Sequence, residues 1–126
     1  MKLGTKENVL LAIYIEYQKD LPDMGSVNNM ALNMDIDVFN VALEKLQNEE
    51  YINGVSMLCA DNNRFYSVDT SHMKLTKQGI DFVEHNFGIA KELTAEDKLK
   101  YIVKKCGVFG YKVLKDIAIE AIKNMV

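Results

Sequence analysis

The sequence predicts an α+β fold that is mainly helical, with one two-stranded hairpin in the middle of the chain. Apolar residues recur at helical spacing on both sides of that hairpin. Between them, residues 54–60 and 64–69 flank Asp61-Asn62-Asn63, and asparagine tolerates the left-handed backbone that a tight hairpin needs. With 126 residues, 48% of them apolar, the chain can bury one core, and a second full domain is not expected.

The first helix is predicted to begin at Thr5, a good N-cap residue, and to end before Pro22. A residue that precedes proline is pushed out of the helical region, so residues 20–23 are expected to form a connection. The inward stripe has helical spacing and consists of Leu10, Ile13, Tyr14 and Tyr17. This helix is therefore expected to be amphipathic.

Ser26 and Asp35 are favourable N-caps, and each one predicts a helix after it. The helix at residues 27–33 is expected to direct inward Val27, Met30, Ala31 and Met34. The helix at residues 36–50 is expected to direct inward Ile36, Phe39, Leu43 and Leu46. Two short helices, a hairpin and a further helix form the element order of a winged helix-turn-helix module, which mostly serves to place one helix in a DNA groove.

Thr76 and Thr94 predict the start of two further helices, and Leu75 is expected to pack on Ile80 inside the first of them. The helix after Thr76 is expected to bury Ile80, Val83 and Phe87. The helix after Thr94 is expected to bury Leu99, Ile102, Val103 and Cys106. The last helix is expected to bury Leu114, Ile117, Ala118, Ala121, Ile122 and Met125. Gly107 or Gly110 is expected to end the helix after Thr94. The break at residues 87–90 predicts a winged helix-turn-helix domain over residues 1–90. A helical extension over residues 91–126 would pack on it or on a second subunit.

The net charge of −3 conceals an asymmetry between the two parts of the chain. Residues 1–90 hold 7 Lys/Arg and 13 Asp/Glu, which gives −6, whereas residues 91–126 hold 8 and 5, which gives +3. A nucleic-acid-binding protein usually presents a basic face. Here the module that would read DNA is the acidic part, and Arg64 is the only arginine in the chain.

The sequence offers no pattern for catalysis, for a cofactor or for a metal. It contains no GxSxG, glycine-rich phosphate loop or HExxH motif, so an enzyme is not expected. Cys59 and Cys106 form no CxxC pair and are expected to pack as small reduced hydrophobes, and His72 and His85 have no matching ligand cluster. The longest apolar run, residues 9–15, is too short to span a membrane, and a cytoplasmic location is the default expectation.

Three features of the sequence stand together: the stretch FNVALEKLQNEEYING at residues 39–54 with its YI-x-G ending, the predicted hairpin, and LTKQG at residues 75–79. Together they resemble winged-helix transcription regulators, and in particular the small YjcQ-like proteins of bacteria and their phages. The resemblance covers residues 26–86, about half of the chain, and implies a winged-helix fold. Many relatives have glycine where this chain has Glu50, so the helix end must be capped differently. Because the family's role is itself inferred from the fold, the resemblance implies little about function.

If the module binds double-stranded DNA, the outer side of the helix at 36–50 faces the major groove and the hairpin tip forms the wing. The candidate residues are Asp37, Asn40, Val41, Glu44 and Lys45 on the helix, Asn62, Asn63 and Arg64 in the wing, and Lys74 and Lys77 beside it. Phosphates repel the carboxylates in this set, although a carboxylate can accept a hydrogen bond from cytosine N4. A solvated polar helix face and an ordinary polar turn explain the same residues.

Two functions are therefore weighed. The first is a small bacterial or phage DNA-binding protein that regulates transcription, with lysines of the terminal helices as further phosphate contacts. The second is a protein-interaction module that does not bind DNA and offers its acidic helix to a basic protein partner. In both, the apolar stripes of the terminal helices must be covered, and homodimerisation through these helices is one way to cover them.

Overall fold

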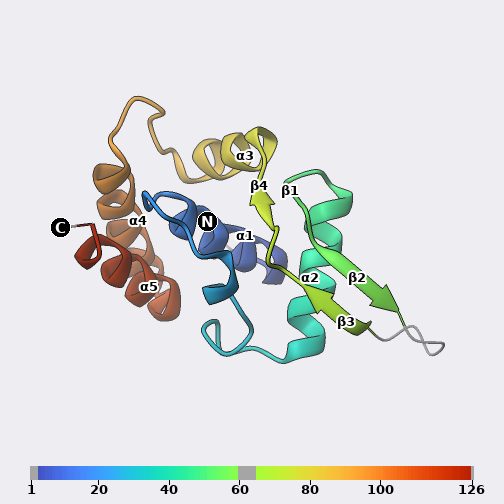
Figure 1. Cartoon of the computed structure of the whole chain (residues 1–126). Helices are drawn as coiled ribbons and strands as arrows, with labels where there is room; N and C mark the ends of the chain where they lie inside the picture. The colour runs from blue at the N-terminus through green and yellow to red at the C-terminus, as the bar shows by residue number, and fades with distance from the viewer. Residues whose placement is uncertain (1–2, 60–64, 126) are drawn as a thin grey trace.

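The computed structural model describes residues 3–59 and 65–125, with side chains omitted at 59, 65 and 66. The helices are α1 (Thr5–Tyr17), the short 3-10 helix η1 (Met24–Ser26), α2 (Ile36–Asn48), α3 (Lys77–Phe87), α4 (Ala95–Phe109) and α5 (Lys112–Lys123). The strands are β1 (Ile52–Asn53), β2 (Ser56–Cys59), β3 (Phe65–Asp69) and β4 (Lys74–Leu75). Figure 1 shows a body of helices with a small strand region on one side, which confirms the predicted α+β, mainly helical class.

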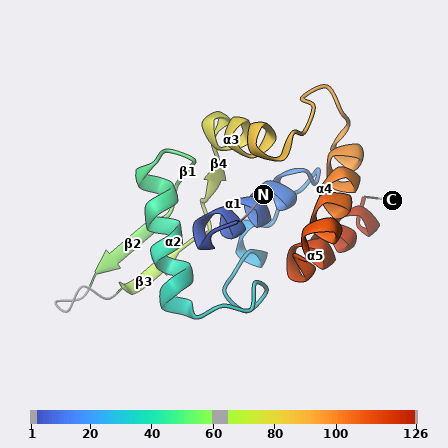
Figure 2. The ribbon, with the colours of Figure 1, turned by 180° about the vertical axis from the view of Figure 1, so that it is seen from behind.

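Helix α1 is the centre of the molecule. Figures 1 and 2 place α2 on one side of it and the α4–α5 pair on the other, with α3 packed against α1 as well. Residues 9–16 are all buried, whereas Tyr17, predicted to point inward, is exposed. The helix is therefore not amphipathic, because it is covered on every side. Its N-cap is Gly4 rather than Thr5, and Glu7 Oε1 accepts a hydrogen bond from Gly4 N at 3.0 Å.

The helix predicted at residues 27–33 is replaced by irregular turns, so this prediction is wrong. Ser26 does not cap a helix; its hydroxyl donates to Glu16 Oε1 at 3.2 Å and to Asp23 O at 2.7 Å. Asn28 Oδ1 accepts a hydrogen bond from Ala31 N at 2.8 Å. The asparagine side chain thus takes a backbone amide that would otherwise bond within a helix. Only Val27 and Leu32 of the segment are buried, while Met30 and Ala31, both predicted to point inward, are exposed.

Helix α2 begins as predicted and ends two residues earlier than predicted. Asp35 Oδ1 accepts from Asp37 N at 2.8 Å, which confirms the cap. Phe39, Leu43 and Leu46 are buried as expected. Ile36 is instead 49% exposed, because the first turn of α2 extends past the edge of the core.

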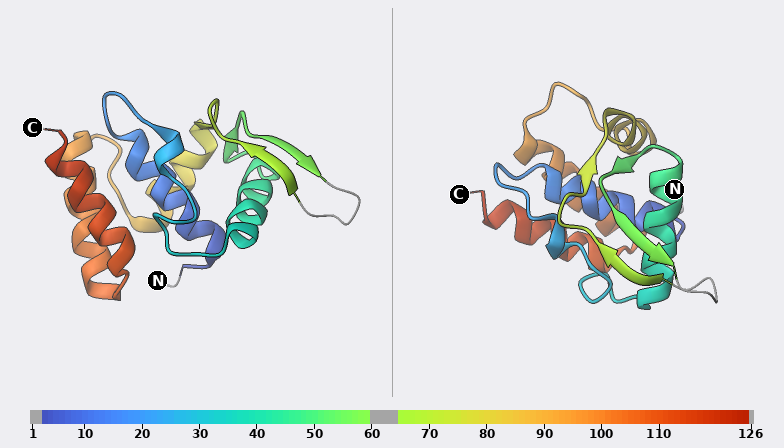
Figure 3. Two further views of the ribbon diagram at one scale, coloured as in Figure 1. Left: turned by 60° about the horizontal axis from the view of Figure 1, so that its bottom comes forward. Right: turned by 45° about the vertical axis from the view of Figure 1, so that its right-hand side comes forward.

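The strands form two short antiparallel ladders. In the first, β1 pairs with β4, with Ile52 opposite Leu75; in the second, β2 pairs with β3, with Met57 opposite Val68. The hairpin β2–β3 confirms the predicted hairpin and projects past α2, as Figure 3 shows. Gln47 fastens its base to α2, since the Gln47 amide donates to Val55 O at 3.0 Å and accepts from Val55 N at 2.9 Å.

The glycines of the YI-x-G and LT-x-x-G motifs are required by close backbone approaches. Gly54 has φ +82°, and a Cβ there would lie 2.0 Å from the carbonyl oxygen of His72. A Cβ on Gly79 would lie 2.3 Å from the carbonyl oxygen of Tyr51. Thr76 Oγ1 donates to Glu50 O at 2.7 Å and also accepts from Gly79 N at 3.0 Å, which confirms Thr76 as the cap of α3. The two motifs thus pack against each other.

The C-terminal helices fold back within the same chain. Thr94 Oγ1 accepts from Asp97 N at 3.1 Å, which confirms the predicted start of α4, and Gly110 with φ +80° ends it. Helices α4 and α5 pack on each other, and α5 packs on α1. Their buried residues, Leu99, Ile102, Cys106, Leu114, Ala118 and Ala121, join the core formed by α1, α2 and α3. Most of the two apolar stripes is therefore covered without a second subunit.

Candidate functional site

Four of the five predicted site residues on α2 share its outer side. Asp37, Val41, Glu44 and Lys45 are exposed or partly exposed, together with Val38. Asn40 is buried where α2 meets residues 27–29 and β3, so it does not belong to that surface. The reason is its angular position, since Asn40 lies a single turn from the buried Leu43 and points to the same side of the helix. We call the set Asp37, Val38, Val41, Glu44 and Lys45 the α2 face.

The α2 face is more apolar than its sequence pattern indicates. Val38 is 45% exposed and Val41 is 39% exposed. These residues border a groove of about 640 Å³ between α1 and α2. The groove is lined by Thr5, Lys6, Glu7, Asp37, Val38, Val41, Ala42 and Lys45. Two partly exposed valines thus border the groove among the charged side chains of Lys6, Glu7, Asp37 and Lys45.

The segment that contains α2 is strongly acidic. Residues 35–50 hold Asp35, Asp37, Glu44, Glu49 and Glu50 against the single cation Lys45, so five negative charges and one positive charge give −4. Lys6 compensates one of them, with its Nζ 2.7 Å from Glu49 Oε1. The remaining carboxylates would be repelled by a phosphate backbone and would attract a cationic partner.

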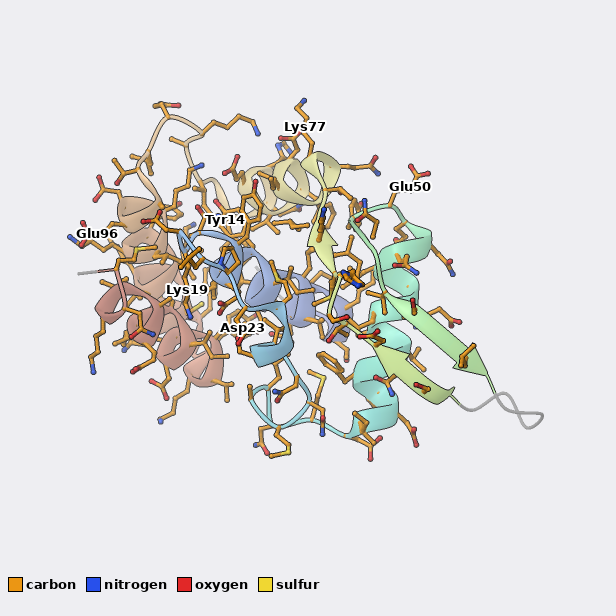
Figure 4. The ribbon with its side chains drawn as sticks, viewed as in Figure 1. Tyr14, Lys19, Asp23, Glu50, Lys77 and Glu96 are labelled. Carbon is orange, nitrogen blue, oxygen red and sulfur yellow. The ribbon has the colours of Figure 1, made fainter. Side chains whose placement is uncertain are left out.

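The predicted wing residues are only partly placed by the structure. Asn62, Asn63 and Arg64 lie outside the described residues. Lys74 lies in β4 opposite Asn53, and Lys77 is in the first turn of α3, 3.7 Å from Asp81 Oδ2. Figure 4 shows Lys77 at the far end of the strands from the hairpin tip. Lys74 and Lys77 therefore lie where β4 meets α3, at the base of the hairpin, and a contact of either lysine with phosphate stays a prediction.

The buried carboxylate of Glu84 pairs with two lysines of the C-terminal region, which the DNA-binding hypothesis uses as phosphate contacts. Glu84 Oε2 accepts from Tyr14 Oη and from Lys98 Nζ, both at 2.8 Å, and Glu84 Oε1 lies 3.0 Å from Lys91 Nζ. Lys91 also forms an ion pair with Asp81. This cluster joins α1, α3 and α4, and Figure 4 shows Tyr14 pointing into the region between them. Lys91 and Lys98 thus serve the fold.

The pKa shifts of the cluster follow from this geometry. Burial by itself raises the pKa of Glu84, but the hydrogen bonds from Lys98, Lys91 and Tyr14 outweigh burial and lower it. Burial and the bond to Glu84 raise the pKa of Tyr14 far above its usual value. The sequence contained a signal for this cluster, since Glu84 falls within the helical stripe of Ile80, Val83 and Phe87 and needs a cationic partner there.

The remaining titratable residues of the described chain do not gather into a metal site. Across residues 3–59 and 65–125, no group of three His, Cys, Asp or Glu side chains is placed to hold a metal ion. Cys106 is a free thiol in the core, as predicted, and burial raises its pKa to about 11. None of the described helices is long and apolar enough to cross a membrane.

Comparison with known proteins identifies the family of the chain but no individual relative. No curated protein and no solved structure matches the chain significantly. The family model for the YjcQ protein matches residues 8–102, which extend from α1 into α4. This match includes both glycine motifs and the residues of the Glu84 cluster. The chain belongs to the YjcQ family.

Proposed function

We propose that the chain is a protein-interaction module, not an enzyme, and that it binds a basic, apolar segment of a partner protein on the α2 face and in the adjoining groove. The observation that supports this proposal is the exposure of Val38 and Val41 amid the acidic residues of the 35–50 segment. Exposed apolar residues that adjoin a groove are typical of docking sites. The helix-in-groove mode suits this surface best.

The energetics favour a partner with both apolar and cationic groups. Covering the exposed parts of two valines contributes about 1–2 kcal/mol at the usual value per unit of apolar area. Carboxylates at the rim add attraction for lysine or arginine and accelerate the encounter at low salt. A phosphate backbone would meet the same carboxylates with repulsion, so the local charge favours a basic protein over DNA.

Fluorescence anisotropy with two labelled model helices tests this function. We expect an amphipathic Leu/Lys peptide to bind, and an amphipathic Leu/Glu peptide of equal length to bind far more weakly. Val41→Lys should weaken binding of the Leu/Lys peptide by about tenfold or more, since it removes apolar contact and adds a like charge.

The matched control is Leu21→Lys, which makes the same change at a residue that is 89% exposed and outside the groove. This variant should bind the Leu/Lys peptide as the unmodified chain does. Equal affinity for both peptides, or an unchanged affinity in Val41→Lys, would exclude the α2 face as the docking site.

A second candidate function is the binding of duplex DNA by a small bacterial or phage transcription regulator. The observation in its favour is the hairpin β2–β3, which comes after α2 and β1 in the chain and projects past α2. Wings of this kind contact phosphates or the minor groove in winged helix-turn-helix proteins.

Anisotropy with a random duplex at low salt separates the two functions. DNA binding predicts an affinity that falls steeply with salt and is weakened by the double variant Arg64→Ala with Lys77→Ala. An affinity unchanged in that variant removes the wing from the interface. No binding at micromolar protein rejects the second candidate and leaves the first.

A further inference from the structure

We propose that the partner of the α2 face is a second copy of this chain, which docks the corner between its α4 and α5 helices into the α1–α2 groove. The α4–α5 corner is defined here as residues 104–116. This inference rests on the proposed function, because it names the partner for the same site. Three properties of the corner support it: its exposed apolar residues, its charge and its position.

The corner exposes apolar side chains that the core does not use. Val108 is 75% exposed, Phe109 is 42% exposed and Val113 is 38% exposed. They lie on the last turn of α4 and the first turn of α5, at the end of the helical pair, as Figure 3 shows. A projecting apolar corner has the shape that a groove accommodates.

The corner is as basic as the α2 segment is acidic. It holds Lys104, Lys105, Lys112 and Lys115 against Asp116, so four positive charges and one negative charge give +3. Unlike Lys91 and Lys98, these lysines are not drawn into the Glu84 cluster. Lys105 Nζ lies 5.5 Å from the centre of the Tyr101 ring, and Lys112 pairs with Asp116 on the surface at 3.2 Å. Their charges are therefore presented to solvent.

The two surfaces complement each other in charge and in shape. The segment at residues 35–50 has a charge of −4 and borders an open groove with two exposed valines, and the corner has a charge of +3 and exposed apolar side chains at its tip. Figures 1 and 2 place α2 and the α4–α5 pair on opposite sides of α1. Docking therefore joins two molecules, and the charge asymmetry of the chain sets their orientation.

An interface between two different surfaces leaves one unused surface on each molecule. Such a heterologous contact extends into an open chain of molecules or closes into a ring, whereas a symmetric dimer would use one surface twice. The exposed apolar set on each side is small, so the contact belongs to the weak and transient class and depends on protein concentration.

Sedimentation velocity and light scattering of the full chain test this inference. We expect the mass to rise above 14.3 kDa with concentration at low salt and to fall back towards it at high salt. Val41→Lys removes the groove surface and Val108→Glu removes the corner, so each variant alone should remain a monomer. Both substituted residues are exposed, so the variants are expected to fold.

Mixing the two variants gives the sharpest result. The intact corner of Val41→Lys should dock on the intact groove of Val108→Glu and give a complex of roughly twice the monomer mass that cannot extend. Leu21→Lys and Leu21→Glu carry the same charge changes at a distant exposed residue and should associate like the unmodified chain.

Three outcomes would overturn the inference. One is a monomer at every concentration, even with the Leu/Lys peptide still bound on the α2 face, which would leave the proposed function intact. The second is self-association that persists in both single variants, which would indicate a symmetric interface elsewhere. The third is a monomer whose corner binds anionic vesicles and loses that binding in Val108→Glu, which would assign the corner to lipid.

Discussion

The α2 face and the α4–α5 corner are built alike and differ in the sign of their charge. Each lies on helices whose opposite side is in the core: Leu43 and Leu46 under the first, Cys106 and Leu114 under the second. Each also exposes apolar residues that the core leaves uncovered. The comparison teaches that packing in the core accounts only for the residues on the buried side of these helices. The charge of the exposed side determines which kind of partner each surface can attract.

The lysines of residues 91–126 divide into two groups that sequence alone treats as one. Lys91 and Lys98 neutralise Glu84 between α1, α3 and α4. The corner lysines remain at the surface, where their Coulomb interactions with a partner are screened by salt and do not stabilise the fold. Two lysines of residues 91–126 therefore stabilise the fold, whereas the corner lysines remain free to interact with a partner.

The largest expected effect separates the core side of α2 from its outer side. Leu43→Ala should lower the free energy of unfolding by about 3 kcal/mol, because Leu43 is fully buried and its removal leaves a cavity. Val41→Ala, two residues away, should lower it by less than about 0.5 kcal/mol. Urea denaturation measures both values. A large loss of stability in Val41→Ala would mean that the α2 face belongs to the core.

A smaller effect is expected in the Glu84 cluster, which joins α4 to α1 and α3. Glu84→Gln should lower the free energy of unfolding by about 2 kcal/mol, because Lys98 loses a buried charged acceptor. Glu92→Gln removes an exposed carboxylate from the same connection and should change stability by less than about 0.5 kcal/mol. Equal effects in the two variants would show that the Glu84 cluster does not hold α4 on α3.

The same carboxylate predicts a pH dependence of stability. The pKa of Glu84 is lowered in the folded chain, so its stabilising contribution is present above the ordinary value of 4.5 and is lost as pH falls through the lowered pKa. The unmodified chain should therefore lose more stability below that pH than Glu84→Gln does. Thermal unfolding at a series of acidic pH values measures the difference, and parallel curves would contradict the assignment.

A modest gain in stability is expected at the end of α2. Glu50 has φ +65°, a left-handed conformation that costs a non-glycine residue about 1 kcal/mol. Glu50→Gly should therefore raise the free energy of unfolding by about 0.5–1 kcal/mol, and it also removes one negative charge from the 35–50 segment. Urea denaturation should show higher stability while self-association becomes slightly weaker. A loss of stability would mean that the Glu50 side chain contributes more than its strain costs.

The smallest effect on stability is expected at the corner. Lys112→Gln breaks an exposed pair with Asp116 and should change the free energy of unfolding by less than about 0.5 kcal/mol. Self-association should still weaken by roughly twofold to fivefold, because the corner loses one positive charge. Asp116→Asn, which raises the charge of the corner by one, should strengthen it. Association that is not weakened in Lys112→Gln, or is weakened in Asp116→Asn, would contradict the electrostatic part of the comparison.

Much of the local structure follows from the sequence because it depends on neighbouring residues. Asp35, Thr76 and Thr94 cap their helices through side-chain oxygens that reach backbone amides two or three residues away. The inward residues Phe39, Leu43 and Leu46 follow from helical spacing. The outer position of Asp37, Val41, Glu44 and Lys45 follows from the same spacing.

Other features depend on contacts between distant parts of the chain. Ser26 is drawn to Glu16 instead of capping a helix, and the predicted helix at residues 27–33 gives way to turns. Glu50 takes the conformation expected of glycine because the Tyr51 amide bonds back to Leu46 O at 3.0 Å and Thr76 binds the Glu50 carbonyl. Asn40 is buried because β3 and residues 27–29 close over its side of α2.

The sequence by itself determined most of the element types, the caps of α2, α3 and α4, and the outer side of α2, since these depend on side chains within a few residues of one another. Tertiary structure alone decided that α1 is enclosed on all sides and that Lys91 and Lys98 pair with the buried Glu84. It also decided that the acidic α2 segment and the basic α4–α5 pair lie on opposite sides of α1. The physical reason is that burial and charge pairing depend on which elements meet in space, and residues 14, 84, 91 and 98 meet only once the chain has folded.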